Sequence, residues 1–250
     1  MYSKLKEREK KILNHLYEDN SITSTQLCER FGITVVTLRK DLDHLESNGL
    51  IIRTHGGAVP VYDATIIERQ KLNNEEKQAI AKAAADMINE GDRIMISAGT
   101  TSSLILRHLH GKRNIHVVTN STLLLTYSRM NPHISITLVG GEFMPSAEAI
   151  AGTIALRELD QFHVSKAFIG ADGYSIEGGI TAHHTELAEI CKKMINRSER
   201  TILISDISKY NKKGFAYIGE LNQLDTLITG KLPDTGIKEL SELGLKIITV

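Results

Sequence analysis

The chain has 250 residues, 41% of them hydrophobic and 24% charged, which is the composition of an ordinary water-soluble folded protein. Its 30 basic and 30 acidic residues give a formal net charge of zero, which argues against bulk non-specific binding of nucleic acid but not against a local basic surface. No apolar run reaches the roughly 20 residues of a membrane-spanning helix, and the charged segment Met1–Lys11 lacks the apolar stretch of a secretion signal, so we expect a cytoplasmic protein.

Residues 1–58 are predicted to form one domain of three helices followed by a hairpin. In the first helix, over Lys4–Tyr17, leucine and isoleucine recur at helical spacing and form one apolar face. Lys4, Arg8 and Lys11 share another face, which either contacts phosphate or is a solvated surface.

The next two helices have recognisable start and stop signals. Thr23 and Gln26 have the spacing of a capping box, and Gly32 is a typical helix end. Thr34 can cap a third helix over Val35–Ser47. Two short helices joined by a glycine-containing turn are typical of a helix-turn-helix, which reads DNA through its second helix.

The third helix is predicted to be amphipathic. At 100° per residue, four apolar residues point toward the core: Val35, Leu38, Leu42 and Leu45. The opposite face carries Val36, Thr37, Lys40 and His44, with Arg39 on its flank. In a major groove, Lys40 can donate to guanine, Thr37 can bind a base or a phosphate, and Val36 can touch a thymine methyl group. Asp41 and Asp43 would repel phosphate, so we expect them beside this surface or paired with a cation.

A hairpin follows. Leu50–Arg53 is predicted to be a strand, and Thr54–Ala58 contains a Gly-Gly turn, as in the wing of a winged helix. Arg53 and His55 at its tip would contact the sugar–phosphate backbone; the alternative is an ordinary hairpin with surface cations.

Three segments of this domain together resemble the DeoR-type winged helix-turn-helix: Leu38–Leu42, Leu45–Leu50 and Arg53–Ala58. The resemblance implies that Arg39 contacts phosphate or a base. The family usually has Arg-Arg-Asp-Leu where this chain has Arg39-Lys40-Asp41-Leu42, so the bidentate fork of a second arginine is lost and the preferred base can differ. The residues that we expect to contact DNA are Thr34, Val36, Thr37, Arg39, Lys40, Arg53 and His55.

Residues 59–74 are predicted to be a linker, because Pro60, Asp63 and two asparagines break the periodicity. The second domain, residues 75–250, begins with a helix and then alternates short apolar strands with helical stretches. The strands are expected near 93–97, 116–119, 135–140, 166–170, 201–206, 225–229 and 246–250. This alternation predicts an α/β domain with a mainly parallel sheet.

Polar residues follow five of these strands, and ligands collect at the carboxyl ends of such sheets. Gly99, Thr100 and Thr101 precede an apolar helix and are predicted to hold a phosphate, although a simple helix start would look similar. Asn120 and Asp172 would bind sugar hydroxyls, and Lys209 would neutralise the phosphate. Each strand end is also compatible with ordinary turn chemistry. The full set expected to bind this effector is Gly99, Thr100, Thr101, Asn120, Gly141, Asp172, Gly173 and Lys209.

The second domain is also similar to the DeoR effector domain, whose fold resembles ribose-5-phosphate isomerase. The matching segments are Ala98–Thr101, Val118–Ser121, Leu138–Gly141, Gly170–Gly173 and Asp206–Lys209. The resemblance implies that a phosphorylated sugar or related metabolite is sensed and that its binding relieves repression.

Two positions depart from the family pattern. The family often has Asp where this chain has Ser97, and Glu-Ala-x-x-Lys where this chain has Leu187 to Cys191. Glu186 and Lys192 are candidates to replace the missing charges, although they point in other directions on a helix. We expect Cys191 and the other cysteine, Cys28, to be buried packing residues.

The sequence therefore predicts a DNA-binding transcriptional regulator, a repressor of sugar metabolism, that binds operator DNA as a homo-oligomer, a dimer or a tetramer. We expect no catalytic residue, no metal and no cofactor. A zinc site or a disulfide framework in particular is not expected, since neither cysteine belongs to a CxxC pair. One alternative is a sugar-phosphate isomerase that uses Asp172 and Lys209. Another is a regulator whose effector is an acid or a nucleotide.

Overall fold

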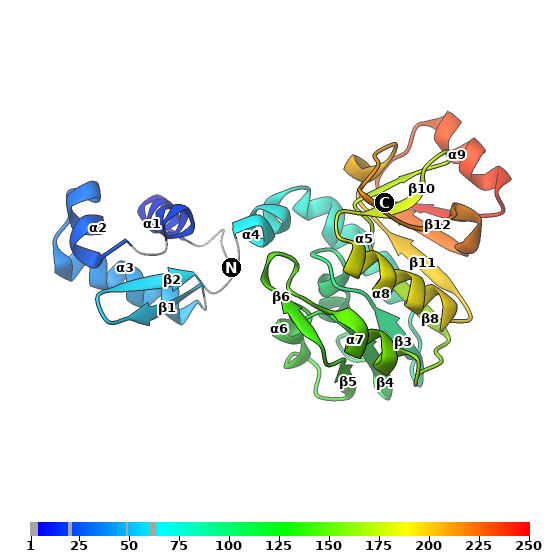
Figure 1. The fold of residues 1–250 in the computed structure, drawn as a ribbon, viewed down its shortest axis with the longest axis horizontal. Helices are drawn as coiled ribbons and strands as arrows, with labels where there is room; N and C mark the ends of the chain where they lie inside the picture. Colours follow the sequence, from blue (N-terminus) through cyan, green and yellow to red (C-terminus); the bar gives the residue numbers. More distant parts are fainter. Residues whose placement is uncertain (1–4, 20–21, 49, 61–63) are drawn as a thin grey trace. The chain divides into compact units, whose positions relative to one another are not determined.

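A computed structural model describes residues 5–19, 22–48, 50–60 and 64–250 of the chain. It groups them into two compact units, Met1–Glu68 and Arg69–Val250 (Figure 1). None of the described helices is long and apolar enough to cross a membrane.

The small unit is the winged helix-turn-helix that the sequence predicts. It contains the helices α1 (Glu7–Glu18), α2 (Ser24–Phe31) and α3 (Val35–Ser47), and then the antiparallel strands β1 (Ile51–Thr54) and β2 (Gly57–Pro60). The capping box is confirmed, because the Thr23 N–H donates to Gln26 Oε1 at 2.8 Å and the Gln26 N–H to Thr23 Oγ1 at 3.3 Å. Gly32 ends α2 with φ +60°, a left-handed conformation that favours glycine.

The core of this unit differs from the prediction at two positions. Leu38, Leu42 and Leu45 are buried as expected, but Val35 is 65% exposed. Val35 is the first residue of α3, where the helix has not yet reached the hydrophobic core. Cys28 is only half-buried at the edge of the same core.

The segment predicted as an irregular linker, 59–74, is largely structured. The strand β2 continues to Pro60, and helix α4 spans Ala64–Lys71. The helix forms because most residues between Asp63 and Asn73 favour helix, and Asn73 stops it with φ +52°. The domain boundaries that the sequence predicts, with the first domain ending at residue 58 and the second beginning at residue 75, remain predictions.

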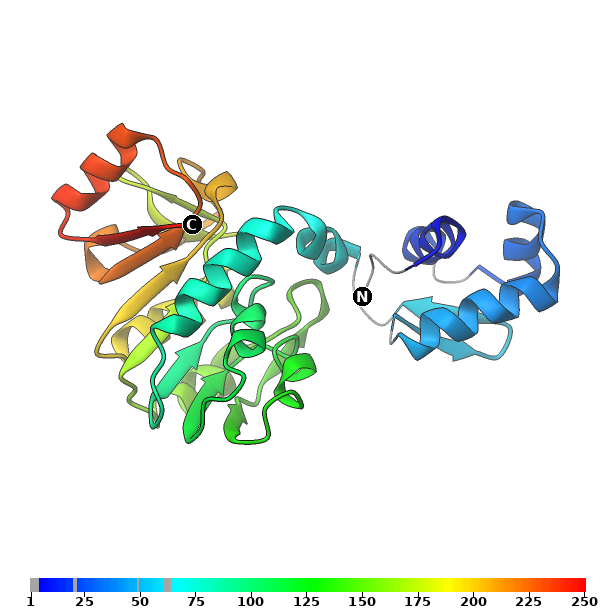
Figure 2. The same ribbon diagram turned by 180° about the vertical axis from the view of Figure 1, so that it is seen from behind.

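The large unit is built on a seven-stranded parallel sheet with the order β14-β13-β11-β8-β3-β4-β5. The strands are β3 (Arg93–Ile96), β4 (Ile115–Thr119), β5 (Ile134–Leu138), β8 (Lys166–Ile169), β11 (Thr201–Ile204), β13 (Thr226–Thr229) and β14 (Lys246–Thr249). All seven lie where the sequence predicts them. Helix α5 (Asn74–Asp86) covers one face of the sheet (Figure 2). Helices α7 (Gly152–Leu159) and α8 (Thr185–Asn196) cover the other face (Figure 1).

Several short elements were not predicted from the sequence. Strands β9 (Gly173–Ser175), β10 (Gly179–Ala182) and β12 (Ala216–Gly219) form a small antiparallel sheet, and β6 (Glu142–Met144) pairs with β7 (Ala149–Ala151). The remaining helical segments are α6 (Leu125–Ser128), η3 (Pro145–Ala147), η4 (Ile207–Lys209), η5 (Leu221–Gln223) and α9 (Asp234–Glu242).

The helix expected after the first strand of the large unit is a 3-10 helix, η2 (Ser102–His108). The Ser103 hydroxyl donates to the Thr100 carbonyl oxygen at 3.1 Å, a local bond that competes with α-helical pairing. Any anion bound at this position would meet the N–H groups of the loop and of the first turn of a 3-10 helix.

Candidate functional site

The outer face of α3 is exposed and carries two unpaired cations. Val36, Arg39 and Lys40 are exposed, and among the described residues neither Arg39 nor Lys40 has a hydrogen-bond or ion-pair partner. The two threonines expected to contact DNA are engaged locally: Thr34 Oγ1 accepts from the Thr37 N–H at 3.3 Å and lies 3.0 Å from Thr37 Oγ1. Because both hydroxyls take part in the helix cap, the groups on this face that remain available to contact DNA are Arg39, Lys40 and Val36.

The two cations of the wing differ in their availability. His55 is exposed beside Gly56 at the turn. Arg53 is tied to α3, because its Nη1 donates to Asp43 Oδ1 at 2.8 Å and its N–H donates to Glu46 Oε1 at 3.1 Å. Asp43 is thus paired with a cation, which was one of the two roles expected for it.

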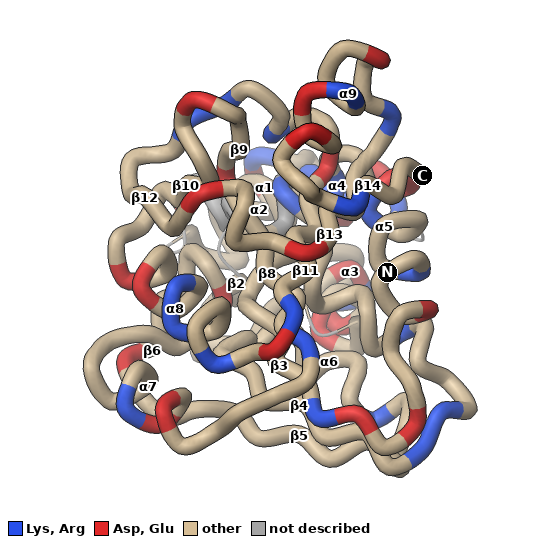
Figure 3. Tube along the Cα trace, turned by 90° about the vertical axis from the view of Figure 1, so that its right-hand side faces the viewer, with Lys and Arg blue, Asp and Glu red and all other residues tan. Residues whose placement is uncertain are grey.

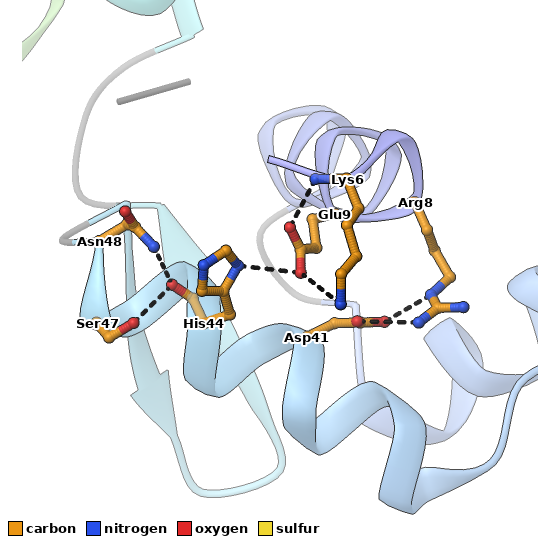
Figure 4. A network of polar contacts seen from close by, with 7 residues as sticks. All are labelled: Lys6, Arg8, Glu9, Asp41, His44, Ser47 and Asn48. Atoms are coloured by element: carbon orange, nitrogen blue, oxygen red, sulfur yellow. Dashed lines mark hydrogen bonds and ion pairs between the residues drawn. The ribbon is translucent and has the colours of Figure 1, made fainter. Parts of the chain in front are cut away.

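A buried polar network sets the orientation of α3 (Figure 4). Asp41, on the buried side of α3, accepts two hydrogen bonds from Arg8 of α1, at 2.7 and 3.0 Å. Glu9, also buried, accepts from the Lys6 N–H at 2.8 Å, and its other oxygen lies 3.0 Å from His44 Nδ1. The network joins α1 to Asp41 on the buried side of α3 and to the exposed His44, which the sequence placed on the face of Lys40. Arg8 is therefore a structural partner, while Lys4 lies outside the described residues.

In the large unit, the predicted effector residues cluster where four neighbouring strands end. The order β11-β8-β3-β4 places the segments after these strands side by side, because parallel strands share one carboxyl edge. Lys209 follows β11, Asp172 follows β8, Thr100 follows β3 and Asn120 follows β4.

The loop after β3 has unused hydrogen-bonding groups. Among the described residues, no hydrogen bond uses the N–H of Gly99, Thr100 or Thr101. The Ser102 hydroxyl is buried and has no partner in the part of the chain that the structure describes, and a Cβ at Gly99 would lie 3.1 Å from it. Consecutive free N–H groups and an unpaired hydroxyl suit an anion such as phosphate.

Three of the predicted residues have structural roles. Asn120 is buried; its Oδ1 accepts from the Ala98 N–H at 2.8 Å, and its Nδ2 donates to the Ile150 carbonyl at 2.9 Å. A Cβ at Gly141 would lie 2.5 Å from the Ala151 carbonyl, and one at Gly173 would lie 2.3 Å from the Lys212 carbonyl. The Asn120 amide, which we expected to bind a sugar, thus connects two loops. Both glycines permit close backbone packing.

We expect Asn120→Ala to destabilise the large unit by about 2 kcal/mol, because it leaves two buried backbone groups without partners. Urea denaturation followed by circular dichroism measures this loss. Asn222→Ala, which removes an exposed asparagine side chain of the large unit, is the matched control. A variant as stable as the parent would contradict the structural role and return Asn120 to the set of ligand contacts.

Two aspartates at the strand ends are bound by residues that were not among the predicted site residues. Asp172 Oδ1 accepts from Arg69 Nη2 at 3.1 Å, and its Oδ2 accepts from the His183 N–H at 2.9 Å. Asp206 Oδ1 accepts from Asn73 Nδ2 at 3.0 Å. Arg69 and Asn73 lie at the junction of α4 and α5, which the sequence suggested to be irregular, so no periodic pattern marked them.

Charge is concentrated around Asp206. Burial alone would raise its pKa, but hydrogen bonds from Ser208 and Asn73 and the ammonium groups of Lys77 and Lys209 outweigh burial and lower the pKa. Lys77 is buried, which lowers its pKa, and it donates to the Arg69 carbonyl oxygen. Lys209 is half-buried and makes no direct contact with a described carboxylate. Among the described residues it is thus a cation of this edge without a direct carboxylate partner, although its charge acts on Asp206.

The two departures from the family pattern lie together. Ser97 Oγ accepts from the Gly170 N–H at 3.0 Å, and Cys191 Sγ lies 4.0 Å from the Gly170 carbonyl oxygen. Burial raises the pKa of Cys191 to about 12, so the thiol stays neutral and is buried as expected. The neighbouring charges do not replace the missing pair, because Lys192 binds Glu189 at 2.7 Å and Glu186 is exposed beside Thr185.

The described residues contain no group of three or more histidine, cysteine, aspartate or glutamate side chains that could hold a metal ion. On the large unit, acidic and basic residues are interspersed along the chain (Figure 3).

Comparison with known proteins identifies both units. A model of the DeoR-like helix-turn-helix domain matches residues 8–62, and a model of the DeoR C-terminal sensor domain matches residues 72–231. The chain is 36% identical over 233 residues to the HTH-type transcriptional repressor GlcR of Bacillus subtilis (strain 168), covering 92% of this chain and 90% of the relative. It is 34% identical over 231 residues to the lactose phosphotransferase system repressor of Lactococcus lactis subsp. lactis, covering 90% of each.

Similarity to solved structures is distant. The full-length sorbitol operon regulator SorC from Klebsiella pneumoniae aligns with a TM-score of 0.42 and 12% identity over 94% of this chain and 99% of that one. A D-ribose-5-phosphate isomerase in complex with phospho-erythronic acid aligns with a TM-score of 0.40 and 19% identity, over 55% of this chain and 54% of the isomerase. At these TM-scores the alignments carry no argument about the ligand.

Proposed function

Because the chain belongs to the DeoR family of DNA-binding transcriptional regulators, we propose that it represses a sugar-metabolism operon and releases the operator when a phosphorylated sugar binds its sensor domain. The carrying observation is the free cationic face of α3, formed by Arg39 and Lys40, which suits the major groove. We further propose that His55 and Arg53 approach the sugar–phosphate backbone. Such a protein acts on DNA, so we also propose a cytoplasmic location.

The relatives are transcriptional repressors, and the chain is a regulator rather than an enzyme. In the structure, both carboxylate oxygens of Asp172 accept hydrogen bonds, from Arg69 and from the His183 N–H.

For the effector we propose that the phosphate binds the free N–H groups of Gly99, Thr100 and Thr101 together with Lys209. The sugar hydroxyls then compete for Asp172. That aspartate holds Arg69, at the end of the helix that leads toward the DNA-binding unit. A ligand that displaces Arg69 from Asp172 would shift the conformational equilibrium at the junction of α4 and α5. An allosteric effect requires such a difference in contacts between the ligand-free and the ligand-bound state.

The test uses the full chain and a DNA duplex that it selects from a random library. Fluorescence anisotropy measures the affinity for this duplex while ribose 5-phosphate, glucose 6-phosphate and fructose 1-phosphate are titrated. Weaker DNA binding with one phosphosugar, but not with the free sugar, supports the proposal. If only an acid or a nucleotide changes the affinity for DNA, the effector is not a phosphosugar, but the chain is still a DNA-binding regulator.

We expect Lys209→Ala to raise the concentration of the active phosphosugar needed for half-release roughly tenfold or more, because a charge-assisted hydrogen bond is lost. The affinity for DNA without effector should not change. Lys238→Ala, which removes an exposed lysine of α9, is the matched control. An unchanged half-release concentration in Lys209→Ala would exclude this lysine from the effector site.

A further inference from the structure

Helix α3 begins with two consecutive apolar side chains that are exposed to water. Val35 is 65% exposed and Val36 is 66% exposed, although the sequence pattern placed Val35 in the core. Residues one turn apart share a side of a helix, so Val35 lies on the side of Arg39 and Val36 on the side of Lys40. The valine pair, Val35 and Val36, is therefore an apolar surface next to the cations that we expect to contact DNA.

The first turn of a helix is a poor place for exposed valine. β-branched residues lose side-chain freedom in a helix, and the N-terminal turn favours acidic residues that complement the helix dipole. Helix α1 follows this preference, with Glu7 and Glu9 in its first turn. The first turn of α3, which lies wholly within the described residues, has no acidic residue. It gives up this stabilisation, and it also carries no negative charge that would repel a nearby phosphate.

The valine pair is ordered before any DNA binds. Thr34 caps α3, because its Oγ1 accepts from the Thr37 N–H at 3.3 Å, and this bond fixes the backbone of the first turn. Valine has one strongly preferred side-chain rotamer in a helix, so its methyl groups have little freedom left to lose on binding. Such preorganised methyl groups suit a partner that is apolar and has a fixed position.

We propose that Val35 and Val36 together select operator DNA by contacting the methyl groups of thymines in the major groove. The thymine C5-methyl group is the apolar group that the bases present in this groove, and the N-terminal residues of a recognition helix reach the base edges. Val35 is then a specificity-determining residue and not a core residue. The inference rests on the proposed binding of DNA by α3 and adds the base that the first turn of this helix reads.

The first test replaces thymidine with deoxyuridine, which removes the methyl group and leaves base pairing unchanged. The full chain selects a duplex from a random library, and each thymidine of that duplex is then replaced in turn. Fluorescence anisotropy should show roughly fourfold weaker binding for each contacted methyl group that is removed. Equal affinity at every replaced position would overturn this inference and leave the binding of DNA intact. A chain that selects no duplex would overturn the proposed function as well.

The second test assigns each methyl group to a valine through double-mutant cycles. Val35→Ala should bind the thymidine duplex roughly fourfold or more weakly, and it should no longer respond to deoxyuridine at one contacted position, because the contact is already lost. Val36→Ala should lose the response at a different position. Responses that persist unchanged in both variants would overturn the assignment to the valine pair.

A matched control separates this effect from a general loss of stability. Ile154→Ala shortens another β-branched side chain, 53% exposed on α7, and it should keep the parental affinity and every response to deoxyuridine. Alanine favours helix more than valine does, so the valine variants should retain α3. Thermal unfolding followed by circular dichroism checks this. A parental affinity for DNA in both valine variants would also overturn the inference.

Discussion

Replacing both Arg39 and Lys40 with alanine is expected to weaken binding of the selected DNA duplex roughly 100-fold or more, because each residue contributes a groove or phosphate contact. The structure supports a large effect, since neither side chain has a described partner that must first be released. Their removal should also leave the fold intact, because both lie on the exposed face of α3.

The single variants separate two kinds of contact. If Lys40 reads a base, Lys40→Ala should bind matched and mismatched duplexes with more similar affinities. If Arg39 holds a phosphate, Arg39→Ala should lose affinity equally for all duplexes and reduce the slope of log affinity against log salt concentration by about one. Anisotropy titrations at several salt concentrations measure both quantities. Lys82→Ala, an exposed lysine of α5, is the control. Unchanged affinity in both single variants would place the DNA contacts elsewhere.

The features that depend on local sequence were predicted well. Capping of α2 by Thr23 and Gln26 needs only residues three positions apart, and the apolar stripe of α3 follows from helical periodicity. The seven strands of the parallel sheet were recognisable because each is a short run rich in apolar and β-branched residues. The small strands β9, β10 and β12 each contain a glycine, which reads as a turn signal and interrupts the apolar run.

The features that depend on distant partners could not be predicted in this way. Asn120 follows a strand and is polar, so it resembled a ligand contact, but its partners include Ile150, 30 residues away. Asp172 looked like a free carboxylate because Arg69 lies 103 residues earlier in the chain. The same holds for Asp41, which occupies the buried face of α3 and would be unfavourable there without Arg8. A sequence shows that such residues are polar, but it does not show whether their hydrogen-bonding atoms already have partners in the folded protein.

The Arg8–Asp41 pair therefore allows a sharp test of what orients α3. Asp41→Ala removes a buried carboxylate together with its two hydrogen bonds, and we expect it to destabilise the small unit by about 2 kcal/mol. Arg8→Ala should be the more damaging change, although Arg8 is the more exposed partner, because it leaves the Asp41 charge buried without compensation.

Hydrogen–deuterium exchange of the full chain measures this prediction locally, since faster exchange of α1 and α3 amides reports the lost free energy of the small unit while α5 and α8 serve as internal controls. The double variant should resemble Asp41→Ala more than Arg8→Ala, because removal of the carboxylate abolishes the unpaired charge. Equal effects of the two single changes would mean that the pair acts through packing alone. In that case packing of the α3 leucines alone would keep Lys40 on the exposed face, and the ion pair would not contribute.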